Sequence, residues 1–288
     1  MRRLFFSSEG RLRNGWWVLL FFLVLAVFGL PQAGVQWLGR KAGLAGDLWL
    51  RVLGTLGLLA TTWTVLKLRK ESFASVGFQL NRRWFAEFGW GTAIGMVQMA
   101  IAVLLVWTLG GVRLELDPAR TLRALSSGLF FFLVVAINEE TLFRGFPFQR
   151  LRDGIGVWPT QLLMAAFFAL SHWDNPGMHG ATKVWATLDI GIGAVVYGVA
   201  YFRTGSLALP IGLHLGWNWM QGHVLGFGVS GFQEGGWFRP VFLGKPEWLT
   251  GGSFGVEASI FAVLVDLTLL GLLLAWRGSL PPPPAQPA

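Results

Sequence analysis

Three short stretches of this sequence carry ionisable or amide side chains inside otherwise apolar runs. In the first, the apolar LFFFLVVAI leads into Glu139-Glu140-Thr-Leu-Phe-Arg144. An ionisable group in a membrane span costs about 2.5–3.5 kcal/mol on insertion scales, so these residues are candidates for function. Glu140 and Arg144 are four residues apart on one helical face and can pair. Because Glu139 is rotated by about 100° from Glu140, we expect the arginine to hold one glutamate while the other faces a cavity.

The second and third stretches add imidazole and amide groups. FFALSHW places Phe168 and His172 four residues apart, and LPIGLHLGWNWM does the same for His214 and Asn218. Each pair therefore shares one helical face. At the rise per residue of an α-helix, all three stretches reach one layer of the membrane interior. Taken singly, each also fits a structural role: an ion pair locking two helices, a hydrogen-bonded packing histidine, and an interhelical hydrogen-bond pair.

In this order, the patterns Glu-Glu-x-x-x-Arg, Phe-x-x-x-His and His-x-x-x-Asn resemble the CPBP family of intramembrane endopeptidases (CAAX proteases and bacteriocin-processing enzymes, also called ABI or Rce1-like). The resemblance covers roughly a third of the chain. It implies a glutamate-dependent peptidase in which Glu139 is the general base that activates water and His172 helps to hold that water. His214 and Asn218 would polarise the scissile carbonyl and stabilise the oxyanion, as such donors do in peptide hydrolysis generally.

The same resemblance implies supporting roles for three neighbours. Glu140 and Arg144 would orient the site, in agreement with their predicted pairing, and Phe168 would pack its wall. Whether a divalent metal such as zinc takes part stays open, since two histidines and a glutamate can ligate zinc but the HExxH spacing of soluble metalloproteases is absent. If a metal is bound, its expected ligands are Glu139, His172 and His214.

Three functional hypotheses follow. The first is a CAAX prenyl protease-like endopeptidase that hydrolyses a peptide bond in a membrane-associated or prenylated substrate, so that its partners are membrane lipid and a peptide or lipidated protein. The second is a proton- or ion-coupled transporter, because carboxylates and histidines inside membranes also serve as relays. The absence of inverted halves counts against transport. The third is a non-catalytic immunity or binding scaffold of the same fold.

Composition assigns the chain to the membrane class. Of 288 residues, 53% are hydrophobic and 13% are charged, against about 25% charged in a typical soluble domain. The mean hydropathy is +0.55. Most basic residues lie in short loops between apolar runs, so the net charge of +8 indicates topology and anionic lipid rather than nucleic acid. With no cysteine, disulfides, zinc thiolates and cysteine nucleophiles are excluded.

The positioning elements are predicted to be membrane-spanning helices, which makes the fold an all-α polytopic bundle with its active site inside the membrane. We expect a single integral membrane domain over 1–288, a catalytic core at 121–226, and a disordered Pro-rich tail at 280–288. The long segment near 226–255 is predicted to be an interfacial hairpin or a lid. About eight spans are predicted, at 15–38, 46–66, 86–110, 124–147, 157–173, 183–202, 206–226 and 256–276.

Orientation follows from the loops. More of the loop lysines and arginines lie on the side that holds both ends of the chain, which predicts cytoplasmic termini by the positive-inside rule. No small-residue cleavage site follows the basic N-terminal stretch, so the first span is expected to be retained. We therefore expect a multi-pass integral membrane protein, in the plasma membrane if the host is bacterial.

Overall fold

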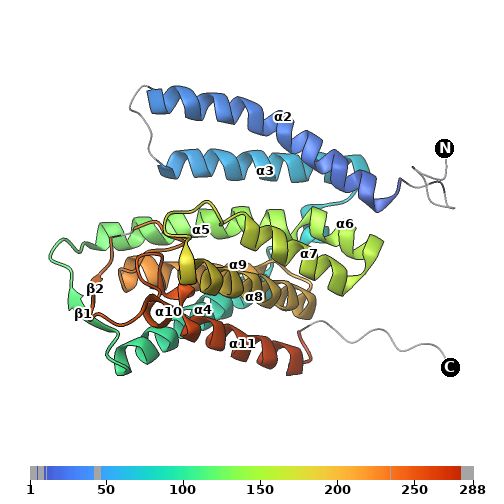
Figure 1. Ribbon diagram of the computed structural model, residues 1–288. Helices are drawn as coiled ribbons and strands as arrows, with labels where there is room; N and C mark the ends of the chain where they lie inside the picture. Colours follow the sequence, from blue (N-terminus) through green and yellow to red (C-terminus); the bar gives the residue numbers. More distant parts are fainter. Residues whose placement is uncertain (1–4, 6–9, 11, 42–46, 234, 280–288) are drawn as a thin grey trace.

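The computed structural model describes residues 5, 10, 12–41, 47–233 and 235–279, and most of them lie in helices (Figure 1). The expected Pro-rich tail at 280–288 lies outside the described residues. The proposed division of the chain at 121–226 stays a prediction. The α-helices are α2 (Asn14–Lys41), α3 (Asp47–Arg69), α4 (Arg82–Thr108), α5 (Leu122–Arg144), α6 (Phe146–Ile155), α7 (Val157–Leu170), α8 (Gly180–Thr204), α9 (Ala208–Trp219), α10 (Glu247–Thr250) and α11 (Ile260–Ala275).

The predicted helical membrane fold is confirmed. Large apolar side chains such as Leu30, Trp90 and Leu122 are at least 70% exposed, as expected for a surface that faces lipid. Each of the eight predicted spans contains a helix, although α7, α9 and α11 have only 14, 12 and 16 residues. Among the described residues, five segments are long and apolar enough to cross a membrane: Asn14–Val35, Leu48–Arg69, Arg82–Thr108, Leu122–Ile155 and Gly180–Thr204. The chain is an integral membrane protein.

The helices form two unequal groups. α2 and α3 pack against each other as a pair along one side of the molecule, drawn in blue in Figure 1. This pair contacts the rest of the bundle through α3 on α5 and α2 on α6. The remaining long helices surround α9, which packs against α4, α5 and α8. The short helix α9 is therefore the centre of the bundle.

Glycines explain why α4 and α9 approach so closely. A side chain added at Gly91 or Gly95 of α4 would collide with the backbone of α9, and one added at Gly212 or Gly216 would collide with the backbone of α4. Small residues four apart allow this kind of contact between membrane helices. Positions two residues beyond each glycine point to the opposite face of the helix, so the α4 contact turns His214 and the residues near it toward the bundle interior.

The predicted fourth span is broken where the sequence reads RGFP. α5 ends at Arg144, and the amide of Gly145 donates to the carbonyl oxygen of Thr141 at 3.1 Å. Pro147 lies in the first turn of α6, a position where its missing N–H removes no helical hydrogen bond. α6 buries Phe146 and Phe148 and carries charged residues in its second half. A separate amphipathic helix therefore follows the polar end of α5.

The segment near 226–255 is partly a β-structure, which the sequence analysis did not predict. β2 (Phe238–Phe242) pairs antiparallel with β1 (Val112–Leu116), so Glu115 lies opposite Arg239. Their side chains form an ion pair at 3.0 Å. The pKa of Glu115 is lowered from its usual value, first by the hydrogen bond from Arg239 and then by that from Arg113. This antiparallel pairing ties the segment to the residues that follow α4.

Candidate active site

The three polar stretches meet at one cavity in the interior of the bundle. Its volume is about 300 Å³, which is at the small end of the range for ligand sites. α5, α7, α8 and α9 supply most of the wall, and the segment after α9 closes one side with Val229, Ser230 and Phe232. Five residues predicted for the site line this cavity: Glu139, Phe168, His172, His214 and Asn218.

Behind the cavity wall lies a closed network of Glu140, Arg144 and His214. Arg144 donates to Glu140 Oε1 at 3.0 Å, which confirms the predicted i,i+4 pairing. His214 Nδ1 lies 3.0 Å from the same oxygen, and the second Arg144 nitrogen donates to the carbonyl oxygen of Ala194 at 2.9 Å. Glu140 and Arg144 are 0% and 1% exposed. Hydrogen bonds to both partners stabilise such a buried charge pair. Ala194 supplies one of these bonds, whereas Oε2 of Glu140 is buried with no hydrogen-bond partner in the described part of the chain.

Aromatic rings hold the network in place. The Arg144 guanidinium lies over Phe168 and Tyr197, 5.1 Å and 5.4 Å from the ring centroids. Tyr197 also stacks on His214 with a centroid distance of 5.3 Å. Cation–π contacts of this kind add attraction in a dry interior. Phe168 contacts both the arginine and, at a centroid distance of 4.9 Å, the His172 ring.

Glu139 lies on the cavity side of the same helix. Its side chain is 26% exposed, against 0% for the neighbouring Glu140. Its Oε2 atom is 3.7 Å from Nε2 of His214, which is longer than a hydrogen bond. Because Nδ1 of His214 faces Glu140, the imidazole bridges the two glutamates with its two nitrogens. The arrangement leaves one carboxylate paired and the other facing the cavity.

The hydrogen bonds of His172 fix which of its nitrogens carries a proton. Nδ1 lies 2.7 Å from the carbonyl oxygen of Phe168, and a carbonyl oxygen can only accept. Nδ1 must therefore hold a proton, and neutral His172 presents the lone pair of Nε2. Such a nitrogen can accept a hydrogen bond from water. His172 lies just beyond the end of α7, where the chain leaves the helix.

Asn218 completes the predicted set from the next turn of α9. It is 8% exposed, and no hydrogen bond to its amide is present within the described residues. Since it follows His214 by four residues, both side chains lie on the face turned away from the α4 glycines. α9 passes into a π-helical turn at Met220–Val224 directly afterwards, a feature often found near functional sites.

The cavity is also lined by four charged residues that the sequence analysis did not assign to the site. They are Asp189 of α8, Asp266 of α11, Glu257 before α11, and Arg51 of α3. Asp266 accepts from Nε2 of Gln98 at 3.2 Å, and Glu257 accepts from the amide of Ser230. Oδ1 of Asp189 is buried without a partner in the described part of the chain. Arg51 lies in the first turns of α3, with its guanidinium 5.0 Å from the Phe131 ring centroid. The sequence did contain a signal for these four residues, because each of them falls inside a predicted membrane span.

The possible metal ligands do not form a three-ligand group in this arrangement. Across the described residues, no three or more His, Cys, Asp or Glu side chains converge closely enough to hold a metal ion. We therefore derive no step through a metal, and a metal ligated by Glu139, His172 and His214 stays a prediction.

Comparison with known proteins gives one result that bears on this geometry. Residues 121–220 match the family model described as type II CAAX prenyl endopeptidase Rce1-like. The comparisons with curated proteins and with solved structures gave no match. The matched range begins at the N-cap of α5 and ends just after α9, so it contains every residue predicted for the site.

Proposed function

Since residues 121–220 belong to the Rce1-like family, a peptidase family, we propose that this chain is an intramembrane endopeptidase in which Glu139 activates the hydrolytic water. The observation that carries the proposal is the unequal placement of two adjacent glutamates. Glu140 is fully buried and paired with Arg144, whereas Glu139 is 26% exposed and faces the cavity. A general base must reach a water that can also reach the substrate.

The proposed reaction needs only this chain's residues and one water. Glu139 takes a proton from the water while its oxygen attacks the scissile carbonyl carbon. His172 accepts a hydrogen bond from the same water through Nε2. The resulting oxyanion is stabilised by the Asn218 amide and by His214, groups positioned before the charge develops. The carbon–nitrogen bond then breaks, and Glu139 returns the proton to the leaving amine.

The closed network sets the orientation of His214 in this scheme. With Nδ1–H donated to Glu140, His214 can donate from Nε2 only as an imidazolium. Glu139 and Glu140 lie on either side of the ring. Arg144 pairs with Glu140, so Glu139 is left on the cavity side without a close ion pair. Glu140 and Arg144 therefore act through His214 and do not touch the substrate.

The substrate class follows from the family description and the position of the site. The matched model describes prenyl endopeptidases, and the cavity opens among helices that lie in the membrane. We propose a membrane-associated peptide, such as a lipidated C-terminal segment, as the substrate. Its lipid would stay in the bilayer while the peptide bond enters the cavity beside Glu139.

A second function has one specific observation in its favour. Asp189, Asp266 and Glu257 line the same cavity as Glu139, and chains of intramembrane carboxylates also serve as proton relays. A coupled transporter is therefore the alternative. It predicts solute uptake into proteoliposomes that depends on Glu139, which a peptidase does not.

The test is a cleavage assay with purified full-length protein in detergent. A quenched fluorescent peptide with a prenylated C-terminal segment should be cut by the wild type. Glu139→Ala should abolish cleavage, because the proposal assigns acceptance of the water's proton to Glu139 alone. Circular dichroism and size-exclusion chromatography should find the variant folded, since Glu139 makes no close ion pair.

Two results would overturn the proposal. Normal cleavage by Glu139→Ala would show that Glu139 does not activate the water. No cleavage by the wild type of prenylated or unmodified membrane peptides would favour a non-catalytic scaffold, or transport if uptake is found instead.

A further inference from the structure

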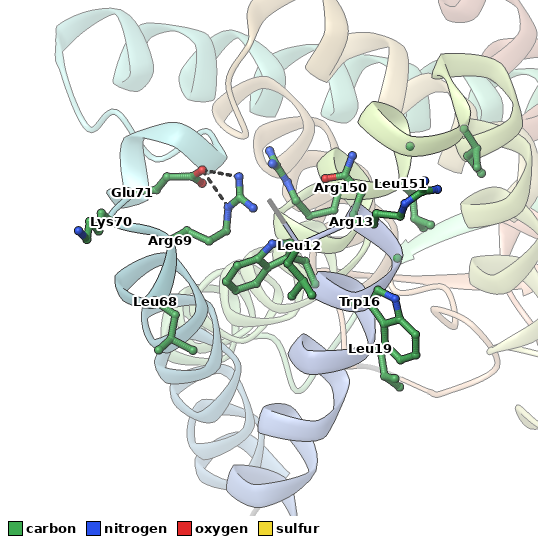
Figure 2. A pocket seen from close by; sticks show the side chains of 15 residues that line it. Leu12, Arg13, Trp16, Leu19, Leu68, Arg69, Lys70, Glu71, Arg150 and Leu151 are labelled. Carbon is green, nitrogen blue, oxygen red and sulfur yellow. Dashed lines mark hydrogen bonds and ion pairs between the residues drawn. The ribbon is translucent and has the colours of Figure 1, made fainter. Parts of the chain in front are cut away.

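A second pocket, distinct from the cavity at Glu139, opens at one end of the α2–α3 pair. It lies between the start of α2, the end of α3 and helix α6, and has a volume of about 1380 Å³ (Figure 2). α2 and α3 are two of the segments long enough to cross a membrane. The pocket therefore lies where spans end, at the depth of lipid headgroups.

Basic side chains are in excess around this pocket. Arg13, Arg69, Lys70 and Arg150 line it, against a single acidic lining residue, Glu71. Arg69 pairs with Glu71 at 2.8 Å. The four basic side chains still outnumber Glu71 and Asp153, the carboxylates that pair with Arg69 and Arg150, so the pocket favours an anion.

Two of these guanidinium groups are held in place and oriented by their neighbours. Arg69 lies over the Trp17 ring at 4.9 Å from its centroid, and Arg150 is bonded to Asp153 at 3.1 Å. Arg69 and Arg150 are close enough to interact electrostatically as like charges, which an anion between them would relieve. Nε of Arg150 is also buried with no hydrogen-bond partner in the described part of the chain. Unsatisfied buried donors are rare and call for a partner.

The rest of the wall is apolar. Trp16, Trp17, Leu19 and Leu68 also line the pocket, and Figure 2 shows the labelled Trp16, Leu19 and Leu68 side chains near the basic groups. Tryptophan is enriched where headgroups meet acyl chains. A free phosphate would use the arginines but leave this apolar wall without a partner. A phospholipid fits both parts.

We propose that this pocket binds an anionic membrane phospholipid, with the headgroup phosphate between Arg69 and Arg150 and the acyl chains along Trp16, Trp17 and Leu68. Lys70 adds positive charge at the edge of the pocket. Basic pockets between membrane helices bind anionic headgroups in this way. The site is separate from the cavity at Glu139, so the proposal stands or fails independently of the peptidase activity.

The experiment measures lipid binding to the purified full chain in neutral detergent. Fluorescent phosphatidylglycerol is displaced by unlabelled phosphatidylglycerol, by phosphatidylcholine with the same acyl chains, or by inorganic phosphate. Phosphatidylglycerol should compete at least about tenfold better than phosphatidylcholine, because each basic group near an anionic lipid contributes about fivefold. Inorganic phosphate should not displace the lipid.

Variants locate the site. Arg69→Gln combined with Arg150→Gln should weaken phosphatidylglycerol binding by at least about tenfold, while the two Lys replacements should retain most of it. Lys70→Gln, at an exposed position, should weaken binding by about fivefold without affecting folding. The matched control is Arg277→Gln, which removes an exposed charge after α11, outside the pocket, and should leave affinity nearly unchanged.

Three outcomes would overturn the proposal. They are equal competition by phosphatidylglycerol and phosphatidylcholine, displacement by inorganic phosphate as effective as by lipid, and equal losses for Lys70→Gln and Arg277→Gln. If the double glutamine variant does not fold, the comparison of Lys70→Gln with Arg277→Gln still tests whether the pocket binds the anionic lipid.

Discussion

The buried polar layer of this protein has two sides that differ in how their charges are satisfied. On the closed side, Glu140, Arg144 and His214 bond to one another and to the backbone. On the cavity side, Glu139, His172 and Asn218 line an open volume of about 300 Å³, and they bond to one another nowhere in the described chain. The two sides meet at His214, which contacts both glutamates.

The difference shows how one turn of helix can supply both stability and chemistry. A buried carboxylate is tolerable only if it is paired, and Glu140 meets this condition through Arg144. The adjacent Glu139 can remain without a close ion pair because it faces the cavity, where its side chain is 26% exposed. The closed side therefore holds the geometry, and the cavity side is left free for a substrate.

Breaking the closed side should have the largest effect on stability. Arg144→Ala removes the buried guanidinium that pairs with Glu140, which should lower the free energy of unfolding by about 3–5 kcal/mol. Thermal unfolding in detergent measures the loss. The control is Arg152→Ala, whose pair with Asp153 is about one-third exposed and should contribute about 0–1 kcal/mol. Equal losses for the two variants would contradict the distinction between the closed side and an ordinary surface ion pair.

Removing a donor from the cavity side should affect turnover instead. Asn218→Ala should lower kcat by about 10²–10³-fold, the usual cost of one oxyanion donor, with little change in melting temperature. Asn175→Ala is the matched control, since it removes another amide that lines the cavity but has no role in the proposed reaction. If Asn175→Ala lowers kcat as much as Asn218→Ala, the assignment of the oxyanion site is wrong.

Metal removal should have the smallest effect. The proposal assigns water activation to Glu139 alone, so dialysis against a chelator should leave the cleavage rate unchanged. Elemental analysis of the same preparation measures bound zinc. A rate that falls on chelation and returns with added zinc would instead assign the cavity side to a metal.

Much of this fold could be predicted from apolar runs, because each helix of a membrane bundle must satisfy its own backbone. The strand pairing of Glu115 with Arg239 could not, since it joins segments more than a hundred residues apart and leaves no periodic pattern. Pro147 is a sequence signal for the break at Gly145, but the apolar run continues past Gly145 and so hides the end of the helix.

The candidate site, like the fold, could be predicted from the sequence only in part. Helical spacing alone predicted the pairing of Glu140 with Arg144 and the shared face of His214 and Asn218. The sequence analysis did not predict that Asp189 and Asp266 reach the same cavity, because that depends on how α8 packs against α11. Nor could spacing predict that His214 would contact both glutamates. The catalytic roles of all these residues stay predictions.

The most direct test compares Glu139→Gln with Glu140→Gln in one preparation, measuring kcat and melting temperature for both. Both changes remove a carboxylate charge with little change in shape. The account predicts that Glu139→Gln loses about 10²–10⁴-fold in kcat while its melting temperature stays near that of the wild type, and that Glu140→Gln is clearly destabilised because Arg144 is left unpaired. Cleavage at the wild-type rate by Glu139→Gln, or an unchanged melting temperature for Glu140→Gln, would contradict it.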